Sequence, residues 1–148
     1  MKAIILLFII GFSLSYDRNA AISYARKYCS NYNSNYQNYQ YDGGDCANFV
    51  SQCMIAGGMD FRSCSVSWID DYGCLPKVRD LKLCLQQKGW KHSTTRPASF
   101  KAGYPIFSTT SSHVMLATGI DGNKIIFCGH NIDRCNATIS SDIEYYYE

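Results

Sequence analysis

Long apolar runs are scarce in this sequence, and their scarcity argues against a membrane protein. The one uncharged apolar run covers residues 3–12, well short of the ~20 residues that a spanning helix needs. It follows Met1-Lys2 and leads into small residues at 13–15, an order typical of a secretory signal. We therefore predict a signal peptide over residues 1–15 and no membrane association after its cleavage. The product should be secreted, or enter the lumen of a secretory or digestive compartment.

A concentrated charge of one sign is also missing. The formal net charge is +2, and Lys and Arg are scattered along the chain. Nucleic-acid binding needs a basic face, so we expect no nucleic-acid partner. Residues 16–148 have the size of one domain with a single core, and we predict a monomer.

Metal-ligand spacing is absent as well. The sequence has no CxxC motif, and His92, His113 and His130 are not spaced as ligands, which disfavours zinc. We predict no metal and no cofactor. The triplet Asn136-Ala137-Thr138 matches a glycosylation acceptor.

Cysteine is abundant, with eight residues, and behind a secretory signal this predicts disulfides. The short-loop pairs Cys64–Cys74 and Cys128–Cys135 are the candidates. An even count allows all eight to pair, so the count does not reveal a free thiol. If one cysteine is free, at least one more must be. The cysteines are Cys29, Cys46, Cys53, Cys64, Cys74, Cys84, Cys128 and Cys135.

Hydrophobic periodicity predicts helices in the first part of the chain. Asp17 or Asn19 can cap a helix that ends near residue 28, and residues 30–41 should form an ordered loop. Asp45 can accept hydrogen bonds from the first amides of a helix that begins at Cys46. The apolar residues of that helix recur at the spacing of a buried stripe, and glycines 57 and 58 end it. A short helix over residues 79–88 follows.

From residue 104 the apolar period changes to two, which predicts strands over 104–107, 113–120, 124–130 and 139–147. Asp121-Gly122 is a strong hairpin signal. If these two residues form the turn, paired residue numbers sum to 243 and His113 lies opposite His130 on the same face. Helices followed by strands indicate an α+β fold.

The start of the second predicted helix is suited to nucleophilic chemistry. Free backbone amides and the helix dipole would stabilise a Cys46 thiolate, and the same amides could stabilise an oxyanion. His113 could take the thiol proton and return it to a leaving amine. The residue that orients this imidazole would be His130, or Asn131 if the turn is one residue longer.

Each of these residues has an ordinary structural interpretation when it is taken alone. A cysteine in a helix stripe is usually core or disulfide, and a strand histidine is usually half-buried. His92 is such a case, and we expect a surface loop there with no functional role. The coincidence of Cys46, His113 and a second polar pair on the next strand favours catalysis.

A longer motif surrounds the candidate nucleophile. Residues 43–53 read Gly-Gly-Asp-Cys-Ala-Asn-Phe-Val-Ser-Gln-Cys, and Ala56-Gly57-Gly58 follow. This segment closely resembles the nucleophile motif of the putative amidase domain family, within the NlpC/P60-like papain-fold peptidases. The resemblance extends to residues 16–21 with Tyr24-Ala25, to His113-Val114 and to His130-Asn131, and thus covers nearly all the mature chain.

The resemblance implies a papain-like fold, in which the cysteine helix packs on an antiparallel sheet. It also implies amide-bond hydrolysis, most often of bacterial cell-wall peptides. Cys46 would be the nucleophile, His113 the base and His130 the orienting residue, while Gln40 or Tyr41 would complete the oxyanion hole.

Two hypotheses follow. The first is a secreted amidase or peptidase that acts through a thioester acyl-enzyme on peptides or peptidoglycan fragments. The second is an inactive disulfide-stabilised protein that binds glycopeptide or cell-wall ligands. A free Cys46 distinguishes the first from the second.

Overall fold

The computed structural model describes residues 15–148. Apart from residue 15, the predicted signal peptide lies outside this range. Three helices precede a six-stranded sheet, which confirms the α+β prediction. The helices are α1 (Arg18–Tyr28), α2 (Cys46–Ala56) and α3 (Val78–Gln87), and the strands are β1 (Lys91–Ser93), β2 (Pro105–Ser108), β3 (Val114–Asp121), β4 (Lys124–Gly129), β5 (Arg134–Ile139) and β6 (Ile143–Tyr147).

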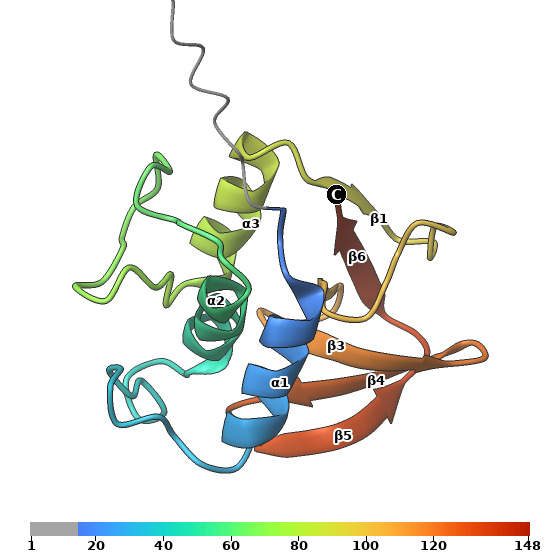
Figure 1. Ribbon diagram of the computed structural model, residues 1–148, viewed down its shortest axis with the longest axis horizontal. Coiled ribbons are helices and arrows are strands. Elements are labelled where there is room, and N and C mark those ends of the chain that lie inside the picture. The colour runs from blue at the N-terminus through green and yellow to red at the C-terminus, as the bar shows by residue number, and fades with distance from the viewer. Residues whose placement is uncertain (1–14) are drawn as a thin grey trace, which may run out of the picture.

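The sheet is antiparallel throughout, in the spatial order β1-β6-β2-β3-β4-β5. Helices α1 and α2 pack against each other and against β3 and β4 (Figure 1). The two helices are also joined end to end, because the Asp17 N–H donates to the Gly57 carbonyl over 2.8 Å. Within residues 15–148, no helix has the length and apolar character needed to span a bilayer.

The predicted helices are present, with small changes at their ends. The Asp17 carboxylate accepts a hydrogen bond from the Ala20 amide at 3.0 Å and caps α1, so of the two candidate caps Asp17 is the one used. Residues 30–41 contain neither helix nor strand, as expected. Helix α3 begins one residue earlier than predicted, and Gly89 follows it with a φ of 83°.

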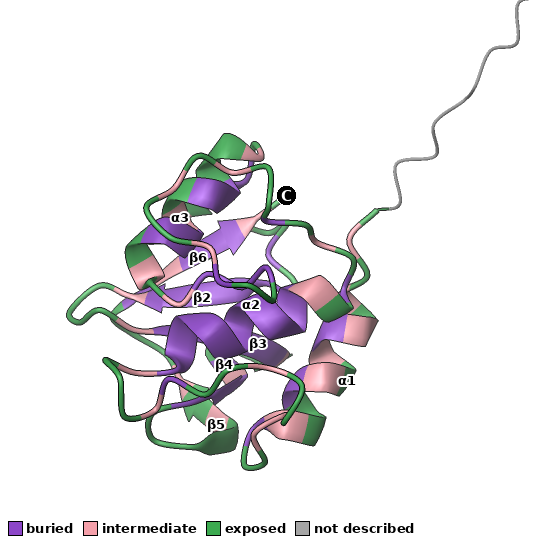
Figure 2. Ribbon diagram, turned by 90° about the vertical axis from the view of Figure 1, so that its left-hand side faces the viewer, coloured by how far each residue is buried: buried purple, intermediate pink, exposed green. Residues whose placement is uncertain are grey.

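Helix α2 is buried more completely than its apolar stripe predicted. All nine residues from Cys46 to Met54 are buried, and Figure 2 shows the helix at the centre of the molecule. Two of its polar side chains bond within the protein: Ser51 Oγ donates to the Ala47 carbonyl at 2.8 Å, and Gln52 Oε1 accepts from the Tyr24 hydroxyl at 2.7 Å. Asn48 Oδ1 is buried without a partner among the residues that the structure describes. Burial on all sides fixes the helix that begins with Cys46.

Two strands were not predicted, and both lie at edges of the sheet. Strand β1 contains His92, which therefore belongs to a strand and not to the expected surface loop; its ring contacts Glu144 at 2.7 Å. Strand β5 is largely exposed, so the inward-outward alternation that marks a half-buried strand is missing from its sequence. The glycosylation candidate Asn136 lies in β5, exposed and with a φ of 56°.

The β3–β4 hairpin has a different register from the predicted one. Asp121 pairs with Lys124, so Gly122-Asn123 form the turn. A register shift between Ala117 and Gly119 then changes the sum of paired residue numbers from 245 near the turn to 244 beyond it. The predicted sum of 243, and with it the placement of His113 opposite His130, is wrong. His113 also precedes β3 instead of lying within it.

The disulfides are Cys29–Cys135 and Cys64–Cys84, so both predicted short-loop pairs are wrong. Closeness in sequence was a poor guide, because Cys74 and Cys128 are fully enclosed in the core. The bridges instead join α1 to β5 and the α2–α3 loop to α3. Two disulfides are consistent with an extracellular protein. Four cysteines are free: Cys46, Cys53, Cys74 and Cys128.

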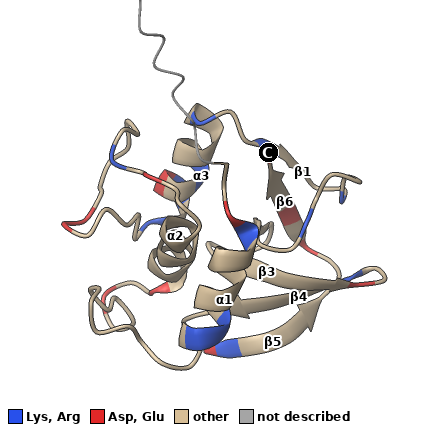
Figure 3. Ribbon diagram, in the orientation of Figure 1, with Lys and Arg blue, Asp and Glu red and all other residues tan. Residues whose placement is uncertain are grey.

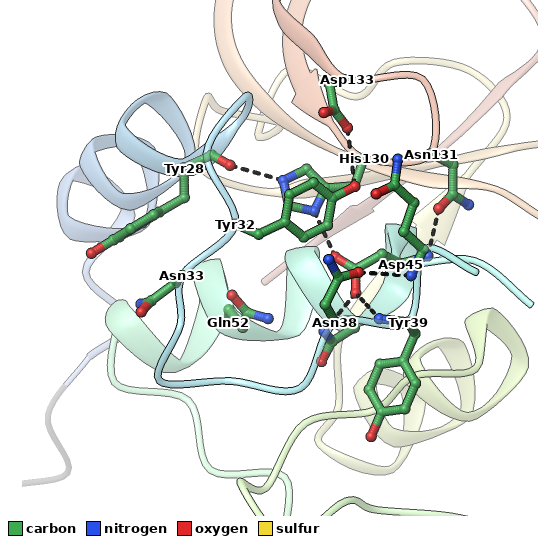
Figure 4. Close-up of polar contacts among 12 residues, drawn as sticks. Tyr28, Tyr32, Asn33, Asn38, Tyr39, Asp45, Gln52, His130, Asn131 and Asp133 are labelled. Atoms are coloured by element: carbon green, nitrogen blue, oxygen red, sulfur yellow. Dashed lines mark hydrogen bonds and ion pairs between the residues drawn. The ribbon is translucent and has the colours of Figure 1, made fainter. Parts of the chain in front are cut away.

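Charged residues are dispersed over the structure, and Figure 3 shows Lys and Arg on α1, α3, β5 and several loops. One charged pair lies inside the core. His130 Nδ1 contacts Asp45 Oδ2 at 2.6 Å, and the two side chains are 2% and 1% exposed. His130 Nε2 lies 2.8 Å from the Tyr28 carbonyl oxygen (Figure 4).

Both ring nitrogens of His130 have an oxygen partner, the Asp45 carboxyl on one side and the Tyr28 carbonyl on the other. Its ring also lies against two aromatic rings, Phe49 at 3.9 Å and Tyr32 at 4.1 Å between centroids. The pair connects the end of β4 to the segment before α2 and to the end of α1.

We expect His130→Gln to lower the free energy of unfolding by about 3–5 kcal/mol, because it leaves the Asp45 carboxylate buried without its partner. Urea denaturation measures this change. The matched control is His92→Gln, which breaks a histidine–carboxylate pair whose histidine side chain is 46% exposed. That control should cost about 1 kcal/mol or less. Equal losses in the two variants would contradict a special role for the buried pair.

Candidate active site

Cys46 lies at the first turn of α2, 5% exposed, where it lines a cleft of about 310 Å³. The backbone amides of Val114, Ala47 and Cys46 itself lie close enough to its sulfur to lower its pKa. The other free cysteines have no exposed surface. Of the free thiols, Cys46 is thus the one that a molecule in a cleft can reach. The remaining lining residues are Asp42, Gly43, Gly44, Trp68, Pro76, Lys77, Val78, Arg79 and Ser112.

Asp45 occupies the N-cap position of α2, but its side chain does not cap the helix, which corrects the sequence prediction. Its Oδ2 accepts from His130, and its Oδ1 accepts from the Tyr39 amide at 2.9 Å and from Asn48 Nδ2 at 2.8 Å. The buried pair thus draws the carboxylate away from the helix end. The first amides of α2 consequently have no side-chain acceptor and remain available to the sulfur or to an incoming oxygen.

The pKa of the Cys46 thiol is raised from its ordinary value, and burial is the main cause. The amides of Val114, Ala47 and Cys46 favour the thiolate and offset part of this effect, whereas the nearby Asp45 carboxylate adds to it. The sequence predicted a thiol ionised at rest by the helix end. That prediction is wrong in direction, because the loss of hydration outweighs the amides.

His113 is the last residue of a tight turn that leads into β3. Its N–H donates to the Ser111 carbonyl and its carbonyl accepts from the Ser108 N–H, both over 2.9 Å. The half-buried imidazole has a pKa below its ordinary value of 6.5, because burial disfavours the charged form. Its neighbours Ser112 and Val114 lie at the cleft and beside the sulfur respectively. They place the His113 backbone next to the thiol, but the His113 side chain does not itself line the cleft.

Neither candidate for the orienting residue contacts His113. Both nitrogens of His130 are engaged with Asp45 and Tyr28, so this residue cannot orient a second imidazole. The Asn131 side chain instead accepts a hydrogen bond from the Asp45 N–H. It also covers Gly44, where an added Cβ would come within 2.4 Å of Asn131 Nδ2. Both residues hold the turn before Cys46. Among residues 15–148, the His113 ring has no hydrogen-bond partner.

The two residues expected to complete an oxyanion hole lie elsewhere. Tyr41 is 90% exposed, and neither Tyr41 nor Gln40 lines the Cys46 cleft. Both belong to the loop that turns outward before Gly43. The oxyanion donors that the structure does provide near the sulfur are backbone amides of the first turn of α2.

Sequence reasoning missed the wall of the cleft formed by Trp68 and residues 76–79. The stretch between α2 and α3 has no periodicity, so nothing in its pattern pointed to the site. In the described part of the chain, no three His, Cys, Asp or Glu side chains converge as metal ligands.

Comparison with known proteins gives one curated relative and one family. The chain is 40% identical over 52 residues to the uncharacterized protein YhbB of Bacillus subtilis (strain 168). The match covers 35% of this chain and 16% of that relative, so the chain spans less than a fifth of its length. No solved structure matches.

The family match is broader than the match to the relative. A family model described as a putative amidase domain matches residues 15–104, a range that contains α1, the whole of α2 and the Trp68 wall of the cleft. The family's description indicates hydrolysis of amide bonds. With more than half of its residues matched, the chain belongs to the putative amidase domain family.

Proposed function

We propose that this protein is a secreted cysteine hydrolase that cleaves peptide amides through a thioester acyl-enzyme, with Cys46 as nucleophile and His113 as base. The observation that carries the proposal is the environment of Cys46. It is a free thiol in a cleft, at the start of a buried helix, and the amide of the residue after His113 lies near enough to favour its thiolate. This arrangement supports the enzyme hypothesis over the inactive scaffold.

The ground state of the proposed pair is neutral. A thiol with a raised pKa keeps its proton at neutral pH, and an imidazole with a lowered pKa stays unprotonated. Proton transfer from sulfur to His113 would then accompany attack on the carbonyl carbon. The amides at the start of α2 would stabilise the resulting oxyanion. His113 would next protonate the leaving amine, and water would hydrolyse the thioester.

A helix that carries the nucleophile and packs on an antiparallel sheet next to the base also supports a papain-like, NlpC/P60-like fold. We further propose bacterial cell-wall peptides as substrates. Two disulfides agree with action outside the cytosol. To test the substrate class, the purified mature protein can be incubated with peptidoglycan fragments and with an unfolded protein. Mass spectrometry of the products identifies the bond that is cleaved.

Cys46→Ala should abolish turnover and change the free energy of unfolding by about 1 kcal/mol or less, because it removes a single sulfur atom at the wall of a cleft. Product formation and urea denaturation measure the two effects. Cys53→Ala is the matched control, since Cys53 is a free and fully buried cysteine of the same helix. The control should retain turnover. Unchanged turnover in Cys46→Ala would refute the assigned nucleophile.

The pH profile should reflect a neutral His113. Since burial lowers the pKa of this imidazole below 6.5, the base stays neutral as the pH falls through 6.5 and becomes charged only below that value. We expect kcat/KM to decline on the acid side with an apparent pKa below 6.5. An acid limb above 6.5 would contradict this assignment.

Alkylation of Cys46 by iodoacetamide gives an independent measure of the thiol. Because burial raises the pKa of Cys46 above its ordinary value of 9.0, the alkylation rate should still increase with pH at pH 9. A plateau at neutral pH would instead indicate a thiolate–imidazolium pair at rest. The other three free cysteines are fully buried, so labelling of the native protein reports on Cys46.

A further inference from the structure

A second pocket, of about 280 Å³, adjoins the Cys46 cleft. Its lining residues come from the loop before α2 and from the loop after it. These two loops are in contact through the ring pairs Tyr36–Tyr72 and Tyr39–Trp68. Two large aromatic side chains on its wall reach solvent, Trp68 at 40% and Tyr72 at 47% exposure. Its other lining residues are Gln37, Tyr39, Asp70 and Asp71.

The aromatic side chains of this pocket are held by buried contacts. Asp70 Oδ1 accepts hydrogen bonds from the amides of Tyr72 at 3.0 Å and Cys74 at 2.8 Å, and Asp70 Oδ2 accepts from the Tyr39 hydroxyl at 3.2 Å. The Tyr39 ring in turn meets Trp68 edge-on, with 5.4 Å between centroids. The pocket is therefore organised before any ligand binds, which reduces the entropic cost of binding.

The chemistry of the lining fits a sugar ring. The faces of Trp68 and Tyr72 offer apolar surface to the C–H face of a pyranose, while the exposed Asp71 carboxylate and Gln37 amide can bond its hydroxyls. Two carboxylates line the pocket and two cations lie beside it, Lys77 over the Trp68 ring and Arg62 at the Asp71 carbonyl, so the lining has no excess positive charge to attract an acidic sugar. The ligand class that satisfies these groups is a neutral saccharide.

The pocket adjoins the candidate active site, because Trp68 lines both. We propose that it binds a neutral saccharide unit, so that a substrate peptide reaches Cys46 while its attached glycan lies against Trp68 and Tyr72. The inference of a saccharide site depends only on the residues that line the pocket. The inference that this saccharide is part of the substrate rests on the proposed amidase function.

Titration of the wild-type protein with N,N′,N″-triacetylchitotriose, followed by tryptophan fluorescence, tests the site. Trp68 is the exposed one of the two tryptophans, since Trp90 is 7% exposed. We expect a saturable signal and a Kd raised at least about fivefold by Tyr72→Ala, the loss typical of a truncated aromatic contact. The matched control is Tyr41→Ala, which removes a tyrosine that is 90% exposed outside the pocket, and its Kd should not change.

A chitotriose-sized oligosaccharide that carries a uronic acid tests the charge argument. It should bind the wild type more weakly than the neutral probe does, and Asp71→Asn should narrow that difference. No binding of the neutral probe, or an equal Kd in Tyr72→Ala and the wild type, would overturn the saccharide site.

Hydrolysis separates this inference from the proposed function. Tyr72→Ala should cleave a sugar-free peptide as the wild type does, and should lose kcat/KM on the same peptide bearing a glycan. Saccharide binding without cleavage of any peptide would refute the amidase and leave the binding site in place. Cleavage of peptides without saccharide binding would refute the saccharide site and leave the amidase proposal in place.

Discussion

The contact between Asp45 and His130 is the interaction on which the arrangement of the site depends. It connects three segments that are remote in sequence: the turn before α2, the end of β4 and, through the Tyr28 carbonyl, the end of α1. Because the two charged side chains are buried, the pair is stable only while both partners are present. Stacking of His130 between Phe49 and Tyr32 adds a geometric constraint to the electrostatic one.

This pair determines what the start of α2 can do. An aspartate before a helix usually bonds the first amides, and at this position it would compete with an oxyanion for the same donors. With Asp45 turned toward His130, the amides of the first turn face the sulfur instead. Asn131 holds the other side of the turn, where only a glycine at position 44 leaves room for its amide. The polar residues around Cys46 thus position its thiol without a hydrogen bond to His113.

Burial sets the electrostatic character of the site. It shifts the pKa of Cys46 upward and that of His113 downward, so both shifts oppose charge separation. Both residues are therefore favoured in their neutral forms. The aromatic pocket adjoins this site through Trp68. The two disulfides join α1 to β5 and the α2–α3 loop to α3.

The sequence by itself determined the helices and the candidate nucleophile, because both depend on patterns of residues that lie close together in the chain. Spacing of apolar residues, a capping residue and a terminating glycine lie within one helix length, and Cys46 is marked by the residues beside it. The tertiary structure alone decided the partners across the sheet. One bulge and a one-residue change in the turn altered which residue faces which, and no local pattern encodes either. The disulfides, the edge strands β1 and β5 and the role of His130 depend likewise on contacts between distant segments, whose geometry exists only once the core has packed.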